Sequence, residues 1–136
     1  IEITESLIID QTPEIEQNVT ALHEQGIGLY LDDFGTGYSN LMHLQRMAFE
    51  AIKIDRSFVM DIPNDVSDME ITAAIIAMAQ KLKLDVVAEG VETIEQVEFL
   101  QNNNCFIVQG YFYSPPIPER ELPELFDKLS DLAERP

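Results

Sequence analysis

The chain has 136 residues, 46% of them hydrophobic, which suits one domain with a substantial core and argues against disorder. Its net charge of −17 argues against unassisted binding to nucleic acid polymers or to an anionic membrane. Cys105 is the single cysteine, so an internal disulfide is excluded, and a reducing, cytoplasmic location is expected.

The first half of the chain alternates apolar runs with helical patterns. The run at 1–5 precedes a helix in which Thr12 is the expected N-cap and Pro13 the first residue. The apolar side chains of this helix recur at helical spacing until Gly26 ends it: Ile15, Val19 and Leu22. The run at 27–33 leads into a glycine loop and a short helix from about Ser39.

The second half repeats this alternation. The apolar runs at 51–55, 85–88 and 106–111 are expected strands. Capping boxes predict the starts of the two helices between them, Ser67 with Glu70 and Thr93 with Gln96. The segment SPPIP follows, and then a last helix from about Pro123. Strands that alternate with helices predict an α/β fold with a parallel sheet covered by helices. Neither a Gly-x-Gly-x-x-Gly motif nor a Walker-type phosphate loop occurs.

Polar residues collect where the expected strands end. They are Glu2, Glu5, Asp32, Asp33, Lys53, Asp55, Glu89, Glu92 and Gln109. The carboxyl ends of parallel strands share one face, which carries the chemistry in open sheets and in barrels. Carboxylates without histidine or thiol partners are ligands for Mg²⁺, Mn²⁺ or Ca²⁺ rather than for zinc. Two adjacent aspartates at a strand terminus can both reach one pocket, which suits a two-metal site.

Ordinary structural roles remain open for several of these residues. The pair Asp32-Asp33 could cap the following turn, and Asp55 could cap its own loop. Glu5 could anchor a loop by hydrogen bonding instead of binding a metal. The two histidines, His23 and His43, fall on expected helices and are interpreted as ordinary helix residues.

Five motifs occur in the order EITES (2–6), DDFGTGYSN (32–40), KIDRSF (53–58), AEGVE (88–92) and QGYFYSPPIP (109–118). In their order and spacing they resemble the EAL-domain phosphodiesterases, which hydrolyse cyclic di-GMP to linear pGpG. The resemblance spans about residues 1–120. It implies in-line attack of a metal-activated water on a phosphodiester phosphorus, with two Mg²⁺ or Mn²⁺ ions in the complete domain.

The resemblance also assigns roles to residues. It implies four metal ligands: Glu2, Asp32, Asp33 and Glu89. It implies catalytic roles for Lys53, which would orient the water, and for the acids Glu89 and Glu92. It implies substrate or loop roles for Gln109, Glu5, Phe34, Gly35, Thr36 and Gly37. In the family, the glutamate that Glu5 matches holds the DDFGTGYSN loop, which is implicated in metal and substrate binding and in dimer-linked regulation.

The family fold is a modified (β/α)₈ barrel of about 250 residues. Its Glu-Ala-Leu motif and a metal-binding asparagine are absent from this sequence. We therefore expect residues 1–136 to be the C-terminal part of one EAL domain, with about five strands, inactive alone and prone to dimerise or pair through open edges. Pro115 replaces a frequent basic residue, and Asn104 and Phe106 also depart from the family pattern.

The expected parent protein carries regulatory sensory or diguanylate-cyclase-like (GGDEF-type) domains, and other domains could tether it to the inner membrane. Two rival interpretations stay open. One is a receptor domain that binds cyclic di-GMP without cleaving it. The other is an interaction domain whose acids are simply solvated, which predicts no effect of metal on stability.

Overall fold

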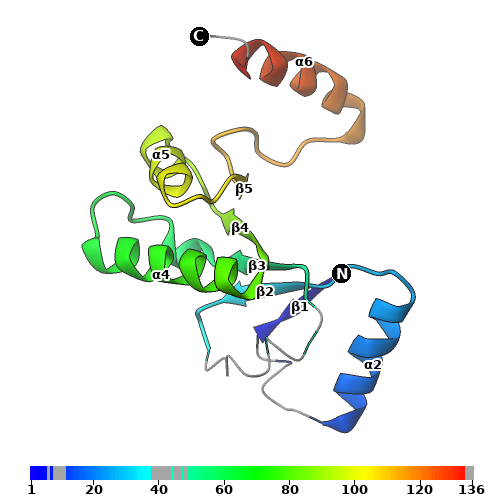
Figure 1. The fold of residues 1–136 in the computed structure, drawn as a ribbon. Coiled ribbons are helices and arrows are strands. Elements are labelled where there is room, and N and C mark those ends of the chain that lie inside the picture. The colour runs from blue at the N-terminus through cyan, green and yellow to red at the C-terminus, as the bar shows by residue number, and fades with distance from the viewer. Residues whose placement is uncertain (6, 8–11, 38–43, 45–46, 48, 134–136) are drawn as a thin grey trace.

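The computed structural model describes residues 1–5, 7, 12–37, 44, 47 and 49–133 and shows one parallel sheet (Figure 1). Its strands follow in spatial order β1-β2-β3-β4-β5. Their bounds are β1 (Glu2–Thr4), β2 (Tyr30–Phe34), β3 (Ala51–Ile54), β4 (Asp85–Glu89) and β5 (Ile107–Gln109). Every neighbouring pair is parallel, so all carboxyl ends share one rim. The predicted α/β class with a five-stranded parallel sheet is confirmed.

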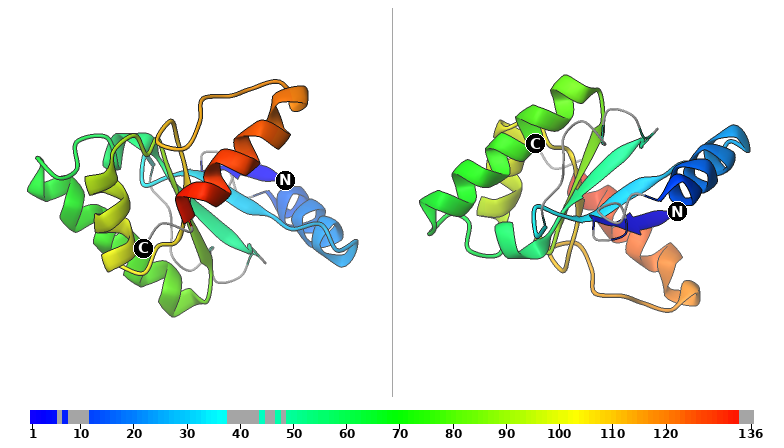
Figure 2. Two further views of the ribbon diagram at one scale, coloured as in Figure 1. Left: turned by 90° about the horizontal axis from the view of Figure 1, so that it is seen from above. Right: turned by 90° about the horizontal axis from the view of Figure 1, so that it is seen from below.

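Helices connect the strands. Their bounds are α2 (Pro13–Glu24), α4 (Val66–Leu82), α5 (Ile94–Asn102) and α6 (Leu122–Ala133), with short 3₁₀ turns η1 (Arg56–Phe58) and η2 (Glu119–Glu121). Helix α4 packs against β3 and β4, and α5 lies beside α4 (Figures 1 and 2). Helix α6 lies beyond β5, at the opposite end of the molecule from α2 (Figure 1). In the described part of the chain, no helix is both long and apolar enough to cross a membrane.

The core lies between the sheet and its helices. Strand β3 is buried along its whole length, as expected for a parallel strand covered on both faces. Ile52 and Ile54 are fully buried and belong to the same apolar cluster as Ile76 of α4 and Leu100 of α5. Lys53 is the charged residue in this strand and is only 5% exposed. Such burial of a charge requires a partner.

Two of the three predicted helix caps are confirmed. The hydroxyl of Thr12 accepts a hydrogen bond from Ile15 N, with Pro13 opening α2. Thr93 and Gln96 form the predicted capping box of α5. The predicted box of Ser67 with Glu70 is wrong, because α4 begins at Val66 with Asp65 as its N-cap. The Asp65 carboxylate accepts from Ser67 N at 2.8 Å and Asp68 N at 3.2 Å, so it satisfies the free amides of the first turn.

Other boundaries shift by a few residues. Strand β2 begins at Tyr30 and extends to Phe34, and α6 begins at Leu122 rather than Pro123. The short helix expected from Ser39 falls mostly outside the described residues. Leu44, which is described, is buried. Gly26 follows α2 with φ +74°, a left-handed conformation that glycine adopts without strain.

Candidate metal and substrate site

An irregularity in β2 brings Asp32 and Asp33 to the same place. Successive side chains on a regular strand point to opposite faces. In β2 the pairing with β3 shifts between Leu31 and Phe34, and Asp33 has a left-handed φ of 55°. Aspartate tolerates this conformation better than most residues. As a result, one carboxylate oxygen each from Asp32, Asp33 and Glu89 lie within 4.8 Å of one another.

The Lys53 ammonium lies among acids from three other strands. Its Nζ is 2.8 Å from Glu2 Oε1, 2.9 Å from Asp32 Oδ1 and 2.8 Å from Glu89 Oε1. Burial by itself lowers the pKa of Lys53, but its close contacts with the carboxylates of Glu2, Glu89 and Asp32 outweigh burial, so this pKa is raised above its usual value. Lys53 therefore stays charged and partly neutralises the acids around it.

The donor set fits a divalent cation. Asp32 Oδ1 is buried and makes the ion contact with Lys53, yet among the described residues no donor reaches it with hydrogen-bond geometry. A buried carboxylate oxygen that lacks a directed donor, beside the carboxylates of Asp33 and Glu89, offers hard oxygen ligands for Mg²⁺, Mn²⁺ or Ca²⁺.

The loop after β2, residues 35–37, is attached to Glu5. We call it the β2 loop. Glu5 is 2% exposed, and its Oε2 accepts from Gly35 N at 3.0 Å and from Gly37 N at 3.2 Å. Its Oε1 is buried without a hydrogen-bond partner in the described part of the chain. Thr36 closes the turn by donating from Oγ1 to Asp33 O at 2.8 Å. Phe34, directly before this loop, is buried in the core.

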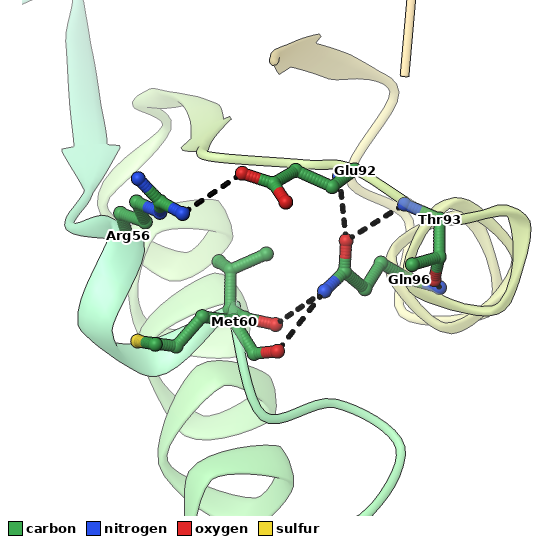
Figure 3. A network of polar contacts seen from close by, with 6 residues as sticks. Arg56, Met60, Glu92, Thr93 and Gln96 are labelled. Carbon is green, nitrogen blue, oxygen red and sulfur yellow. Dashed lines mark hydrogen bonds and ion pairs between the residues drawn. The ribbon is translucent and has the colours of Figure 1, made fainter. Parts of the chain in front are cut away.

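The loop after β4, residues 90–93, carries Glu92. We call it the β4 loop. Glu92 Oε1 accepts from Arg56 Nη2 at 2.8 Å (Figure 3), and within the described residues this carboxylate stays outside the Asp32, Asp33 and Glu89 group. Asp55 is the N-cap of η1 and accepts from Ser57 N at 2.9 Å, so it is a loop cap.

Two concave regions adjoin these acids. The first, of about 500 Å³, is lined by Glu2, Tyr30, Lys53, Val87 and Gln109 among others. Lys53, Val87 and Ile107 are register partners across three strands, so they share one face of the sheet. The second, of about 380 Å³, contains both Glu92 and Gln109. Gln109 pairs with Glu89 in the sheet and borders both hollows, so a neutral residue lines each of them.

The sequence analysis missed Arg56 and Gln96. Arg56 stands in KIDRSF, directly after a strand end rich in acids, and this basic residue could have been noticed as a partner for Glu92. Gln96 was assigned only to the capping box, but it also donates to Val59 O and Met60 O (Figure 3). No periodic pattern in the sequence predicts this second contact.

Known proteins resemble this chain over most of its length. The EAL domain model matches residues 1–116. The chain is 55% identical over 128 residues to the cyclic di-GMP phosphodiesterase NbdA of Pseudomonas aeruginosa, covering 91% of this chain and 16% of NbdA. It is 44% identical over 123 residues to the oxygen sensor protein DosP of Escherichia coli, covering 90% of this chain and 15% of DosP.

Solved structures of related proteins also resemble this chain. A phosphodiesterase structure of MucR in complex with c-di-GMP has a TM-score of 0.85 at 40% identity, covering 89% of this chain and 49% of that chain. A manganese and cyclic di-GMP complex of BlrP1 from Klebsiella pneumoniae has a TM-score of 0.78 at 37% identity, covering 85% of this chain and 30% of that chain. The chain thus spans half or less of these relatives' lengths, and by the family match over residues 1–116 it belongs to the EAL domain family.

Proposed function

We propose that this chain supplies the acid-bearing strands of a phosphodiesterase that hydrolyses cyclic di-GMP to linear pGpG. The observation that carries the proposal is the convergence of Asp32, Asp33 and Glu89 within 4.8 Å, at the carboxyl ends of β2 and β4, the two strands that flank β3 in the parallel sheet. The relative NbdA is named a cyclic di-GMP phosphodiesterase, and the related MucR structure holds c-di-GMP. Both support the choice of substrate.

In this proposal, the carboxylates of Asp32, Asp33 and Glu89 hold two divalent cations together with Glu2. The manganese and calcium complexes of BlrP1 support divalent ions in the family, and we propose Mg²⁺ or Mn²⁺ here. Such ions withdraw charge from phosphoryl oxygens and lower the pKa of a nearby water when bound. The Asp32 oxygen that lacks a directed hydrogen-bond donor supports its role as a metal ligand.

In this proposal, Lys53 contacts the attacking water and Gln109 contacts the nucleotide. The Lys53 ammonium stays protonated in this setting, so it can donate a hydrogen bond to the attacking water and orient it toward phosphorus. The water oxygen bonds to phosphorus while the ribose oxygen leaves with a proton, which gives the linear dinucleotide. Glu89 is close enough to Lys53, at 2.8 Å, to serve as ligand or as proton acceptor for that water. Gln109 and Glu92 line the adjoining hollow, where a neutral amide can contact a nucleotide.

The complete activity requires more chain than residues 1–136 in this proposal. The MucR structure is only 49% covered by this chain, and the EAL domain structure of Mycobacterium smegmatis DcpA is 57% covered. We propose that residues 1–136 form the C-terminal part of one EAL domain and do not turn over substrate alone. The names of DosP, an oxygen sensor, and of MucR, a bifunctional diguanylate cyclase and phosphodiesterase, support regulatory domains beside it. Dimerisation through open sheet edges belongs to the same proposal.

The test is turnover by a chain that carries the whole domain, supplied with cyclic di-GMP and Mn²⁺, with products separated by chromatography. We expect pGpG to appear only with the metal. Asp32→Asn should lower kcat/KM by at least about 100-fold, since it weakens both the cation site and the Lys53 contact. The control Asp127→Asn, on exposed α6, should change nothing. Binding without product would favour a receptor, and no response to either Mn²⁺ or cyclic di-GMP would favour an interaction domain.

A further inference from the structure

A buried amide, Gln96, ties together two segments that lie far apart in the sequence. Gln96 is 2% exposed. Its Oε1 accepts from Glu92 N at 2.7 Å and from Thr93 N at 3.0 Å. Its Nε2 donates to Val59 O at 3.1 Å and to Met60 O at 3.3 Å (Figure 3). The two donors and two acceptor positions of the side chain are therefore all used.

Only half of this pattern is needed to cap a helix. In a capping box the third helical residue needs only an acceptor, and glutamate serves as well as glutamine. The Gln96 oxygen supplies this acceptor for the start of α5. Its amide nitrogen instead reaches the segment after η1, which follows the strand of Lys53. A glutamate could not donate there, so the choice of glutamine points to the second contact.

The rest of the β4 loop also contacts residues that follow β3 and residues at the end of β5 and just after it. Val91 is fully buried, donates to Gln109 O at 3.1 Å and accepts from Phe112 N at 3.0 Å. Arg56 passes over Gly90, where a Cβ would collide with its side chain, and its guanidinium contacts the Glu92 carboxylate. The backbone and the carboxylate of Glu92 are thus both attached to the segment that follows β3.

We propose that Gln96 is a positioning residue for Glu92. It fixes the β4 loop to the residues that follow the Lys53 strand, and so sets where the Glu92 carboxylate stands relative to Lys53. Gln96 itself is buried behind the loop and touches no substrate. The catalytic side of this inference rests on the proposed phosphodiesterase function, whereas the attachment of the loop does not.

Three variants in a chain carrying the whole domain separate positioning from helix capping. Gln96→Glu keeps the acceptor for the α5 start and loses both donations to Val59 and Met60. We expect kcat to fall by about 10- to 100-fold with KM for cyclic di-GMP changed less than about twofold. Thr93→Ala removes the hydroxyl that accepts from Gln96 N at 3.3 Å. It should lower Tm by a few degrees while kcat stays within about twofold.

Gln96→Met gives a readout that needs no turnover. It removes the acceptor, so amide hydrogen exchange at Glu92 and Thr93 should become at least about 10-fold faster than in the parent protein. Unchanged exchange would overturn the attachment. A kcat for Gln96→Glu within twofold of the parent, or a kcat loss in Thr93→Ala equal to that in Gln96→Glu, would overturn positioning. If the parent protein has no turnover, the proposed function and the catalytic role of Gln96 both fail, while exchange still decides the attachment.

Discussion

The β2 loop and the β4 loop follow two acid-bearing strands and are held in opposite ways. The β2 loop depends on one carboxylate, since Glu5 Oε2 accepts from both Gly35 and Gly37. The backbone of the β4 loop depends on a neutral amide, Gln96, and on contacts to Gln109 and Phe112, while the Glu92 side chain adds an exposed ion pair with Arg56. A charged attachment responds to nearby cations, whereas a neutral one does not. We therefore expect charge in the site to affect the backbone of the β2 loop more than the backbone of the β4 loop.

The largest expected effect comes from a steric clash with the backbone of the β4 loop. In Gly110→Ala the new Cβ would collide with the backbone of Val91, which cannot move aside as a side chain could. We expect the free energy of unfolding to fall by about 3 kcal/mol, at the upper end for overpacking. Urea denaturation of the chain carrying the whole domain measures this loss.

Gly26→Ala is the matched control, because Gly26 has φ +74° and its Cβ would meet nothing within 4 Å among the described residues. It should cost only about 1 kcal/mol, from backbone strain alone. Equal losses in the two variants would contradict a tightly clamped β4 loop.

The next largest effect is expected from removing the positive charge of Lys53. Lys53→Met leaves Glu2, Asp32 and Glu89 without their shared cation. We expect a loss of about 2 kcal/mol without metal, below the value for a fully buried pair because these carboxylates are 53%, 21% and 18% exposed.

Mn²⁺ should restore part of this loss by replacing the missing charge, so Tm should rise more with Mn²⁺ in Lys53→Met than in the parent protein. The control is Lys128→Met, at an exposed pair with Glu124, where solvent screens the interaction and we expect no clear change in stability. A smaller Mn²⁺ effect in Lys53→Met would show that Lys53 and the metal do not share these acids.

The sequence predicted what depends on local patterns. Apolar runs placed the five strands, and Thr12 and Thr93 marked two helix starts, because capping uses residues a few positions apart. The sequence also predicted that Asp32, Lys53 and Glu89 lie at one rim, because the carboxyl ends of parallel strands share one edge of a sheet. It missed Asp65 as the cap of α4, because Asp65, Ser67 and Asp68 are all possible capping residues within four positions.

The remaining features arise from contacts between distant segments. The left-handed Asp33 depends on how β2 pairs with β3. The double attachment by Gln96 needs carbonyls of Val59 and Met60, which are 37 and 36 residues away. Such contacts exist only once the sheet has assembled, so no short sequence window contains them.

A smaller effect tests the charged attachment of the β2 loop. Glu5→Gln keeps an acceptor but removes its charge, and hydrogen bonds to neutral groups are weaker by about 1 kcal/mol. Amide exchange should accelerate at Gly35 and Gly37 and stay unchanged at Glu92. The exposed Glu14→Gln on α2 is the control and should alter neither loop. Faster exchange at both loops would remove the distinction between them.

The smallest effect concerns Asp55, which stands between the loops at the end of β3. Its carboxylate accepts from Ser57 N, and asparagine caps about as well as aspartate. Asp55→Asn should therefore change stability by less than about 0.5 kcal/mol and kcat by less than about twofold. A loss of activity like that of Asp32→Asn would assign Asp55 to the metal site instead.

The most direct test of the central claim is anomalous diffraction from crystals of the whole-domain chain soaked in Mn²⁺. We predict anomalous peaks within about 2.0–2.6 Å of carboxylate oxygens of Asp32, Asp33 and Glu89, and these peaks should disappear in Asp32→Asn. Peaks confined to other acids, or none at this rim with Mn²⁺ in excess, would contradict the claim that these strands hold the cations for phosphodiester hydrolysis.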